Sequence, residues 1–245
     1  MKPSNYGRKS SDPSKANTSM YSKKVVEAEE GEIYDIELDK DLMKANEEIA
    51  AKNKELLRKH GVTAIDVMGS IGSGKTTLIE KLVEALKGKH RIAAFKGDLT
   101  TTIDAELIGK HGVEVVPINT GKECHLDANL VKKALQRISL DEIDLIFIEN
   151  VGNLICPSDF SLGSEKRIVV ISVTEGPYMV IKHPFIFMEA DVAVINKKDL
   201  AQAMGVDIER IRLDIKEINP NVKVVATNCR SGENVSEVIN ALGLQ

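Results

Sequence analysis

Residues 69–76, the run Gly-Ser-Ile-Gly-Ser-Gly-Lys-Thr, constrain this chain most, because they match the phosphate-binding pattern G-x-x-x-x-G-K-[ST]. The apolar run at residues 62–68 predicts a buried strand before the loop, and helical spacing follows it. Such a loop turns backbone N–H groups toward phosphate oxygens, and the helix N-terminus adds its positive dipole end. We expect Lys75 to reach the outer phosphates and the Thr76 hydroxyl to bind Mg²⁺. The predicted phosphate site comprises Gly69, Ser70, Gly72, Ser73, Gly74, Lys75, Thr76 and Thr77.

Strand and helix patterns alternate through the rest of the chain, which predicts an α/β fold with a mainly parallel central sheet flanked by helices. The strands are continuous runs of Val and Ile, as expected where helices cover both faces of a sheet. Ligands of such sheets bind beyond the carboxyl ends of the strands. Further strands are predicted at residues 91–95, 113–118, 145–149, 168–173, 192–195 and 222–227. Helices are predicted at residues 103–110, 126–138, 208–218 and 235–242.

The N-terminal sixty residues are predicted to stand apart from the nucleotide-binding domain, which we place at residues 61–245. Residues 1–30 are polar, lack the apolar core of a signal peptide, and are expected to be a disordered or tag-like leader. Residues 31–60 form a helical extension in which Leu42, Ile49 and Leu56 recur every seven positions. That spacing fits either a dimer seam or simple packing on the domain.

Composition excludes several classes of function. The net charge is −4, which argues against a nucleic-acid surface or an anionic membrane as partner. No apolar run approaches the roughly twenty residues that span a bilayer. Three cysteines without a secretion signal indicate a reducing, cytoplasmic location.

The strand at residues 192–195 runs directly into the N-K-x-D element that reads guanine in GTPases. The Asp199 carboxylate can accept hydrogen bonds from the ring N–H and the exocyclic amine of guanine, which adenine does not offer. The Lys197 stem can cover the base plane, and Asn196 can tie this loop to the phosphate loop. In sequence order after a phosphate loop, this element predicts GTP as the ligand.

A later run at residues 228–233 resembles the last nucleotide-binding element of GTPases, whose backbone closes over the base. It adds Cys229 and Arg230 to the predicted nucleotide site. A plain turn between strand and helix fits any single residue there equally well.

Acidic residues at strand ends are the candidates for phosphate sensing. Glu149 ends a buried strand, where a carboxylate can hold the Mg²⁺ shell, and the amide of Gly152 can bond the terminal phosphate. Asp98 follows another strand and is predicted to contact Mg²⁺ or orient the attacking water, although it also fits a helix N-cap. The predicted Mg²⁺ ligands are therefore Thr76, Asp98 and Glu149. The sequence contains no evident arginine finger, so we expect slow hydrolysis by the isolated chain.

Two thiols and an imidazole form a candidate soft-metal site. Cys124 and His125 follow a predicted strand, and Cys156 comes shortly after Gly152. Such ligands suit Zn²⁺ or Ni²⁺ and do not suit Mg²⁺. Three ligands leave a tetrahedral site incomplete, so water or a second subunit would supply the rest. Without a C-x-x-C spacing, buried structural cysteines remain an alternative, and that interpretation is preferred for the Cys229 thiol.

In their order along residues 41–245, these motifs closely resemble those of the hydrogenase nickel-incorporation GTPases, the HypB-type maturation factors of the SIMIBI class. The resemblance implies a P-loop fold, GTP-dependent homodimerisation, and a Ni²⁺/Zn²⁺ site at the dimer interface formed by Cys124, His125 and Cys156. It also implies two protein partners, a zinc-binding hydrogenase accessory protein and the hydrogenase large subunit. The motifs that carry it are the phosphate loop, Glu149 with Gly152, Asn196-Lys197-x-Asp199, Cys124-His125 and Cys156.

The chain departs from some members of that family in one respect. It has no cysteine before Cys124 and no histidine tract, so delivery of nickel is favoured over tight storage. We expect GTP with Mg²⁺ to order the segment after Glu149, position Cys156 and favour the dimer.

Three other functions compete with this one. A urease-type nickel-delivery GTPase would carry Cys-Pro-His, whereas Cys156-Pro157 is followed here by Ser158. A GTP-regulated binding switch without metal is also compatible with the motifs. A small-molecule kinase is disfavoured by the guanine-reading element.

Overall fold

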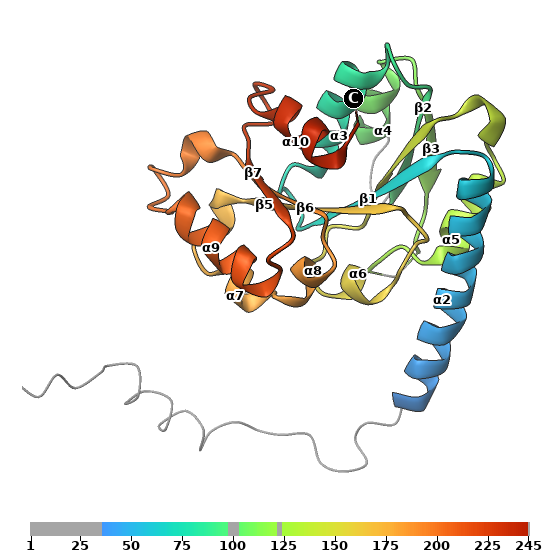
Figure 1. Ribbon diagram of the computed structural model, residues 1–245, viewed down its shortest axis with the longest axis horizontal. Helices are drawn as coiled ribbons and strands as arrows, with labels where there is room; N and C mark the ends of the chain where they lie inside the picture. The colour runs from blue at the N-terminus through green and yellow to red at the C-terminus, as the bar shows by residue number, and fades with distance from the viewer. Residues whose placement is uncertain (1–35, 98–102, 122–123, 245) are drawn as a thin grey trace, which may run out of the picture. The chain divides into compact units, whose positions relative to one another are not determined.

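A computed structural model describes residues 36–97, 103–121 and 124–244 (Figure 1). The chain divides into two units, Met1–Lys40 and Asp41–Gln245, and the second holds the elements discussed below apart from residues 36–40 of the first helix. The predicted leader at residues 1–30 lies outside the described residues. None of the described helices is long and apolar enough to cross a membrane.

Among the described residues, seven strands form one sheet in which every neighbouring pair runs parallel. The spatial order is β3-β2-β4-β1-β5-β6-β7. The prediction of a mainly parallel sheet is confirmed, and all seven predicted strands are present. Their bounds are β1 Thr63–Gly69, β2 Ile92–Gly97, β3 Glu114–Ile118, β4 Leu145–Glu149, β5 Lys166–Ser172, β6 Val192–Asn196 and β7 Lys223–Ala226.

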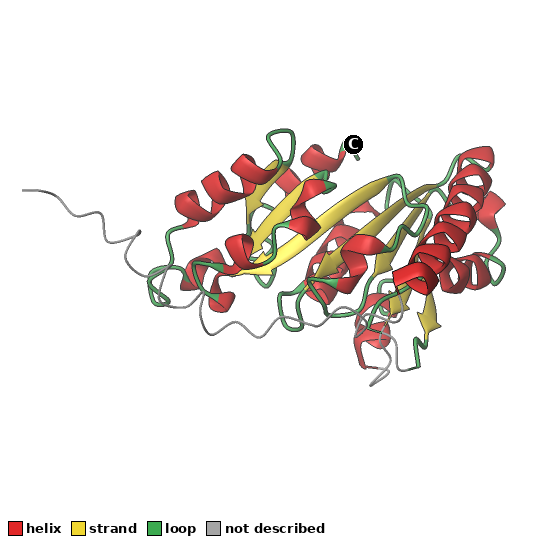
Figure 2. Ribbon diagram, turned by 90° about the horizontal axis from the view of Figure 1, so that it is seen from below, coloured by secondary structure: helices red, strands yellow, loops and turns green. Residues whose placement is uncertain are grey.

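Helices cover both faces of the sheet (Figure 2). Side chains of α3, α4 and α10 form one apolar cluster with strand residues such as Ile65 and Val170. On the other face α2 and α5 cover one half of the sheet, and α7, α8 and α9 cover the other half. The helices are α2 Ile36–Lys59, α3 Lys75–Leu86, α4 Ile103–Gly109, α5 Ala128–Leu135, α6 Cys156–Asp159, α7 Met179–Lys182, α8 Phe185–Met188, α9 Ile208–Ile218 and α10 Val235–Leu242.

The central strand β1 shows why the sheet is buried on both sides. Ile65 and Val67 point into the cluster with α3, whereas Ala64 and Met68 point into the clusters of the opposite face. Successive strand residues alternate between faces, so a run without polar interruptions requires two apolar covers. Asp66 is the exception in this run and is fully buried.

The N-terminal helix α2 packs on the domain through a face that shares only Leu56 with the core contacts of the heptad pattern. Its buried residues include Asn46, Ala50, Asn53 and Leu57, whereas Leu42 is exposed. The amide of Asn53 donates to the carbonyls of residues 128 and 162, at 2.8 and 3.2 Å. Of the two predicted uses of this helix, packing on the domain is therefore observed, on a different stripe.

Candidate functional site

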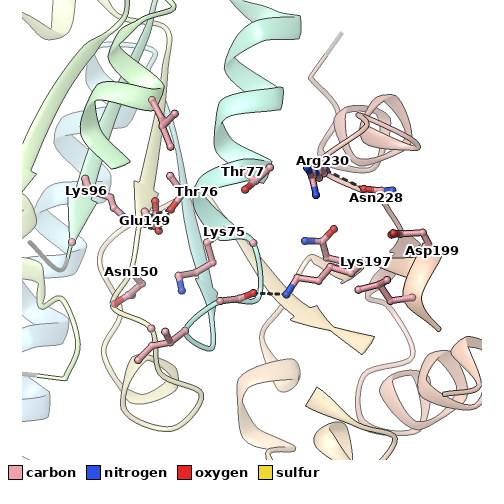
Figure 3. Close-up of a pocket in the computed structure, with 18 residues that line it drawn as sticks. Lys75, Thr76, Thr77, Lys96, Glu149, Asn150, Lys197, Asp199, Asn228 and Arg230 are labelled. Atoms are coloured by element: carbon pink, nitrogen blue, oxygen red, sulfur yellow. Dashed lines mark hydrogen bonds and ion pairs between the residues drawn. The ribbon is translucent and has the colours of Figure 1, made fainter. Parts of the chain in front are cut away.

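The carboxyl ends of the strands surround a pocket of about 740 Å³, which is of the size that nucleotide-like ligands need (Figure 3). The end of β2 and the loops after β1, β4, β6 and β7 contribute to its wall. Parallel strands bring these distant segments to one edge, as expected for open α/β sheets. The lining residues are Ile71, Gly72, Gly74, Lys75, Thr76, Thr77, Lys96, Gly97, Leu107, Glu149, Asn150, Gly152, Asn196, Lys197, Asp199, Leu200, Asn228 and Arg230.

The phosphate loop joins β1 to α3, and the backbone at Gly74 approaches Asn196 closely. Gly74 has a φ of 105°, and a Cβ there would collide with the Asn196 amide nitrogen. Lys75 begins α3, and its ammonium donates to the carbonyls of Gly69 and Ser70 at 3.0 and 2.9 Å. The loop therefore curls around the lysine that is predicted to reach the outer phosphates.

The guanine-reading element is attached to the phosphate loop by its own side chains. The Asn196 amide donates to the carbonyl of Ser73 at 2.8 Å. The Lys197 ammonium donates to the carbonyl of Gly72 at 2.8 Å, as Figure 3 shows. Asp199 lines the pocket between these groups and the loop after β7. These hydrogen bonds join the base-reading loop to the phosphate-binding loop.

The loop after β7 contributes through different groups at adjacent positions. Arg230 and Asn228 line the pocket. The Cys229 side chain is fully buried in the apolar core, and burial raises the pKa of its thiol. Its backbone N–H donates to Asn196 Oδ1 at 3.0 Å. Cys229 thus positions a nucleotide-site residue from behind, through its backbone.

Thr76 and Glu149 meet at the end of β4, where the Mg²⁺ site is predicted. The Thr76 hydroxyl donates to Glu149 Oε1 at 2.8 Å. Glu149 Oε2 is buried and has no hydrogen-bond partner among the described residues. Hydroxyl and carboxylate oxygens are the hard donors that Mg²⁺ prefers, so these two residues fit the ion. Asp98, the third predicted ligand, lies outside the described residues.

Lys96 is a part of this site that the sequence reasoning missed. It lies beside Glu149 in the register of β2 and β4, forms a buried ion pair with that carboxylate, and donates to Thr76 Oγ1 at 3.2 Å. Within an apolar run at the end of a strand, a single lysine gave no local signal of this partner. The signal depends on strand order, which is a tertiary property.

The segment after Glu149 touches the phosphate loop at Gly152. A Cβ on Gly152 would collide with the side chain of Ile71 and lie 3.1 Å from its Cα. The next residue, Asn153, forms an antiparallel bridge with Gly69. The position predicted to sense the terminal phosphate therefore lies against the phosphate loop itself.

Cys124, His125 and Cys156 come together as predicted from their chemistry. Their candidate ligand atoms all lie within 4.8 Å of one another, with the two sulfurs 2.8 Å apart. Cys124 and His125 lie in the loop before α5, and Cys156 is the first residue of α6. The His125 ring stacks on Phe160, with centroids 3.8 Å apart. A stacked ring has less rotational freedom, which favours one orientation of the imidazole nitrogens.

Asn150 connects the thiol loop with the segment that follows Glu149. Its side-chain oxygen accepts from the backbone N–H of Leu126 at 3.1 Å and of Val151 at 2.9 Å. Its amide nitrogen donates to Asp66 Oδ1 at 3.2 Å. Burial raises the pKa of Asp66 to about 6, partly offset by the charge of Arg167 and by this hydrogen bond. Asn150 thereby links the core, the nucleotide pocket and the residue next to His125.

Comparisons with known proteins agree with this geometry. Residues 63–226 match the family model described as CobW/HypB/UreG, nucleotide-binding domain. The chain is 57% identical over 204 residues to the probable hydrogenase maturation factor HypB of Methanocaldococcus jannaschii, covering 83% of this chain and 92% of that protein.

Two solved structures share the fold. HypB from Archaeoglobus fulgidus is 45% identical with a TM-score of 0.77, over 82% of this chain and 98% of that one. HypB from Helicobacter pylori, solved in complex with nickel, is 34% identical with a TM-score of 0.76, over 81% of this chain and 93% of that one. The resemblance noted from the motifs is therefore confirmed. The chain belongs to the CobW/HypB/UreG family of nucleotide-binding proteins and, within it, to the HypB-type hydrogenase maturation factors.

Proposed function

We propose that this protein is a slow GTPase and metallochaperone that binds nickel or zinc, and that its nucleotide state controls dimerisation and metal transfer to [NiFe]-hydrogenase. Its protein partners are then the hydrogenase large subunit and a zinc-binding accessory protein. The observation that carries the proposal is that one segment, residues 149–156, connects the nucleotide pocket with the thiol–imidazole cluster. This segment begins at the pocket with Glu149, touches the phosphate loop at Gly152, and ends in the thiol of Cys156.

The nucleotide part of the proposal is supported by the lining of the pocket. Lys75 and the loop N–H groups suit phosphates, and Asp199 offers the acceptor that guanine requires. Thr76 and Glu149 would hold Mg²⁺, which neutralises charge on the phosphates when bound. Among the described residues, the positively charged side chains of the pocket wall are three lysines and Arg230. This small number is in keeping with slow hydrolysis.

The metal part is supported by the chemistry of the three ligands and by the coordination position that they leave open. Thiolates and an imidazole select borderline or soft ions, so nickel and zinc are the candidate cargoes. Three ligands leave at least one coordination position for water, for a client protein or for a second subunit. An open position favours release of a metal over permanent storage.

The homodimer is supported by apolar side chains beside the cluster. Ile155 precedes Cys156 and is exposed, and on the neighbouring helix α8 the side chains of Phe185 and Met188 are also exposed. Phe185 is 71% exposed. Ile155 and Phe185 line a groove of about 440 Å³ next to α6. A second subunit that covers this face would bury apolar area and bring another set of ligands to the metal.

Nickel titration in two nucleotide states tests the proposal. Isothermal titration calorimetry with GDP and with a non-hydrolysable GTP analogue should give nickel affinities that differ, by about tenfold for a typical coupling. Size-exclusion chromatography with light scattering should show a dimer with the analogue and nickel. Equal nickel affinities in the two states would exclude the coupling.

Cysteine variants separate this function from a switch without metal. Cys124→Ala and Cys156→Ala should lose nickel by elemental analysis, while Cys229→Ala, which removes a buried thiol outside the cluster, should retain it. Metal content unaffected by all three changes would leave only a GTP-regulated binding protein.

A further inference from the structure

The buried cation beside the predicted Mg²⁺ ligands suggests an order of binding. This inference rests on the proposed Mg²⁺–GTP site. We propose that the Lys96 ammonium and Mg²⁺ are alternative counter-ions of Glu149, so that Mg²⁺ enters the site together with the nucleotide and not before it. Lys96 then acts as an internal competitor of the metal at Glu149 and Thr76.

Because Lys96 and Glu149 are both buried, each charged side chain requires the other as its counter-charge. Their residues are 5% and 3% exposed, and they are neighbours in the register of β2 and β4. A carboxylate with so little water around it requires a counter-charge to remain ionised. The ammonium of Lys96 supplies that charge through the ion pair.

The ammonium also occupies an oxygen that Mg²⁺ needs. Thr76 Oγ1 donates its proton to Glu149 and accepts a hydrogen bond from Lys96 at 3.2 Å. A hydroxyl oxygen has two lone pairs, and the lysine N–H engages one of them, so Mg²⁺ would use the other. Glu149 Oε2 also remains available to the metal, so Mg²⁺ at these oxygens would lie next to the Lys96 ammonium.

Phosphate is the anion that can release the lysine. Lys96 lies in the wall of the same pocket as the phosphate loop, so phosphate oxygens of a bound nucleotide are available as new acceptors. Without a nucleotide, Mg²⁺ and the ammonium would share one carboxylate in a region of low dielectric, and their repulsion would oppose metal binding. With a nucleotide, the phosphates add negative charge that accommodates both cations.

A purely structural ion pair would behave differently. If Lys96 only stabilises the end of β2, its neutralisation would weaken the fold and would leave metal affinity the same or lower. Competition predicts the opposite for the metal, because removing the internal cation leaves Glu149 and Thr76 available. The two interpretations thus differ in the sign of one measurable quantity.

Binding of Mn²⁺, a paramagnetic substitute for Mg²⁺, is the test. Free Mn²⁺ is quantified by electron paramagnetic resonance with the full chain, first without nucleotide and then with GDP. Lys96→Met should bind one Mn²⁺ without nucleotide at least about tenfold more tightly than the natural protein, and the difference should shrink with GDP. Lys96→Arg, which keeps the charge, should bind as weakly as the natural protein.

Control variants test whether a change in Mn²⁺ affinity is specific to the charge of Lys96. Lys89→Met removes an exposed charge near the start of β2 and should leave Mn²⁺ affinity unchanged. Lys96→Gln is the second neutral variant, for use if Lys96→Met does not fold. In the natural protein labelled with ¹³C at the lysine ε-carbon, the signal absent from Lys96→Arg should shift on addition of Mg²⁺ with GDP, and Mg²⁺ alone should not shift it.

Two results would overturn the inference without contradicting the Mg²⁺ site. One is an equal or weaker Mn²⁺ affinity in the neutral variants, and the other is a Lys96 ¹³C signal that does not shift on addition of Mg²⁺ with GDP. Absence of stoichiometric Mn²⁺ in the natural protein with GDP would instead reject the Mg²⁺ site, and the inference with it. Glu149→Gln with GDP provides the reference for a protein without that site.

Discussion

The nucleotide pocket and the thiol–imidazole cluster are built in opposite ways. The pocket is closed by hydrogen bonds among its own loops, such as those from Asn196 to Ser73 and from Lys197 to Gly72. Among the described residues, the cluster joins an exposed thiol, Cys124, to two partly exposed ligands and offers three ligand groups. One region is preorganised by its own loops, whereas the described ligands of the other leave room for further ones. This difference suits a protein that holds its nucleotide in a fixed way and passes on its metal.

The largest expected effect on the nucleotide pocket comes from substituting Asp199, the carboxylate predicted to accept hydrogen bonds from guanine. Asp199→Asn should lower GTP affinity by about a thousandfold, because an amide presents a donor to the two donors of guanine. Nickel affinity without nucleotide should remain within twofold. Fluorescence titration with a labelled GTP analogue measures the first quantity and calorimetry the second.

Recovery of binding with xanthosine triphosphate, whose extra carbonyl can accept from the new amide, would identify the loss as one of base recognition. Equal GTP affinity in Asp199→Asn and the natural protein would exclude the assigned role of Asp199.

Removing one ligand from the thiol–imidazole cluster should weaken metal binding with little effect on the nucleotide pocket. Cys156→Ala removes one of three ligands and should weaken nickel binding by about a hundredfold, since each ligand counts for much in so small a set. GTP affinity should change less than twofold. Competition with a colorimetric chelator measures the nickel affinity. The neighbouring change Ser158→Ala serves as the control, and a similar loss of nickel there would point to damage to α6.

The link between the two halves can be probed through Asp66, which holds Asn150 from within the core. Because the pKa of Asp66 in the folded protein is raised to about 6 from 3.8, the native state binds the proton more tightly than the unfolded state. Stability should therefore fall as pH rises from about 4 to 6 and stay lower above that range.

Asp66→Asn should relieve this cost and increase the free energy of unfolding by about 3 kcal/mol at pH 7, with little change at pH 4. Urea denaturation at both pH values measures the difference. Glu114→Gln, an exposed change on β3, should give curves parallel to those of the natural protein. A stabilisation by Asp66→Asn that is equal at both pH values would contradict ionisation as its cause.

The smallest expected effect concerns the orientation of the imidazole. Phe160→Leu removes the ring that stacks on His125 but keeps an apolar side chain, and should weaken nickel binding about threefold. Calorimetric titration resolves such a change. A loss as large as that of Cys156→Ala would mean that Phe160 supports the whole cluster and not one ring.

Sequence patterns located the strands and the nucleotide motifs because both are local. A continuous Val/Ile run predicts a strand, and G-x-x-x-x-G-K-[ST] carries its own turn chemistry. The short helices α6, α7 and α8 were missed, since four residues are too few to establish a helical period. The packing face of α2 was also missed, because Asn46 and Asn53 pack through hydrogen bonds to backbone carbonyls, which an apolar pattern does not register.

Residues whose roles depend on tertiary neighbours were beyond the sequence. Lys96 acquires its partner from the adjacency of β2 and β4, and Asn150 connects three segments that are distant along the chain. The cysteines and His125 could be named from their chemistry. Their convergence could not be derived from spacing, because it depends on the loop before α5 meeting the start of α6.

The bridge between Gly69 and Asn153 also bears on metal preference. Only Leu154 and Ile155 separate this anchor from Cys156, about 10 Å of fully extended chain. With so short a tether, we expect a shift of the phosphate loop to alter the separation of the two sulfurs or the angle at which Cys156 presents its own. Zn²⁺ accepts a tetrahedral arrangement, whereas Ni²⁺ also accepts a square plane. If the cluster binds metal as proposed, a small displacement at Gly69 would thereby change which of the two ions it prefers.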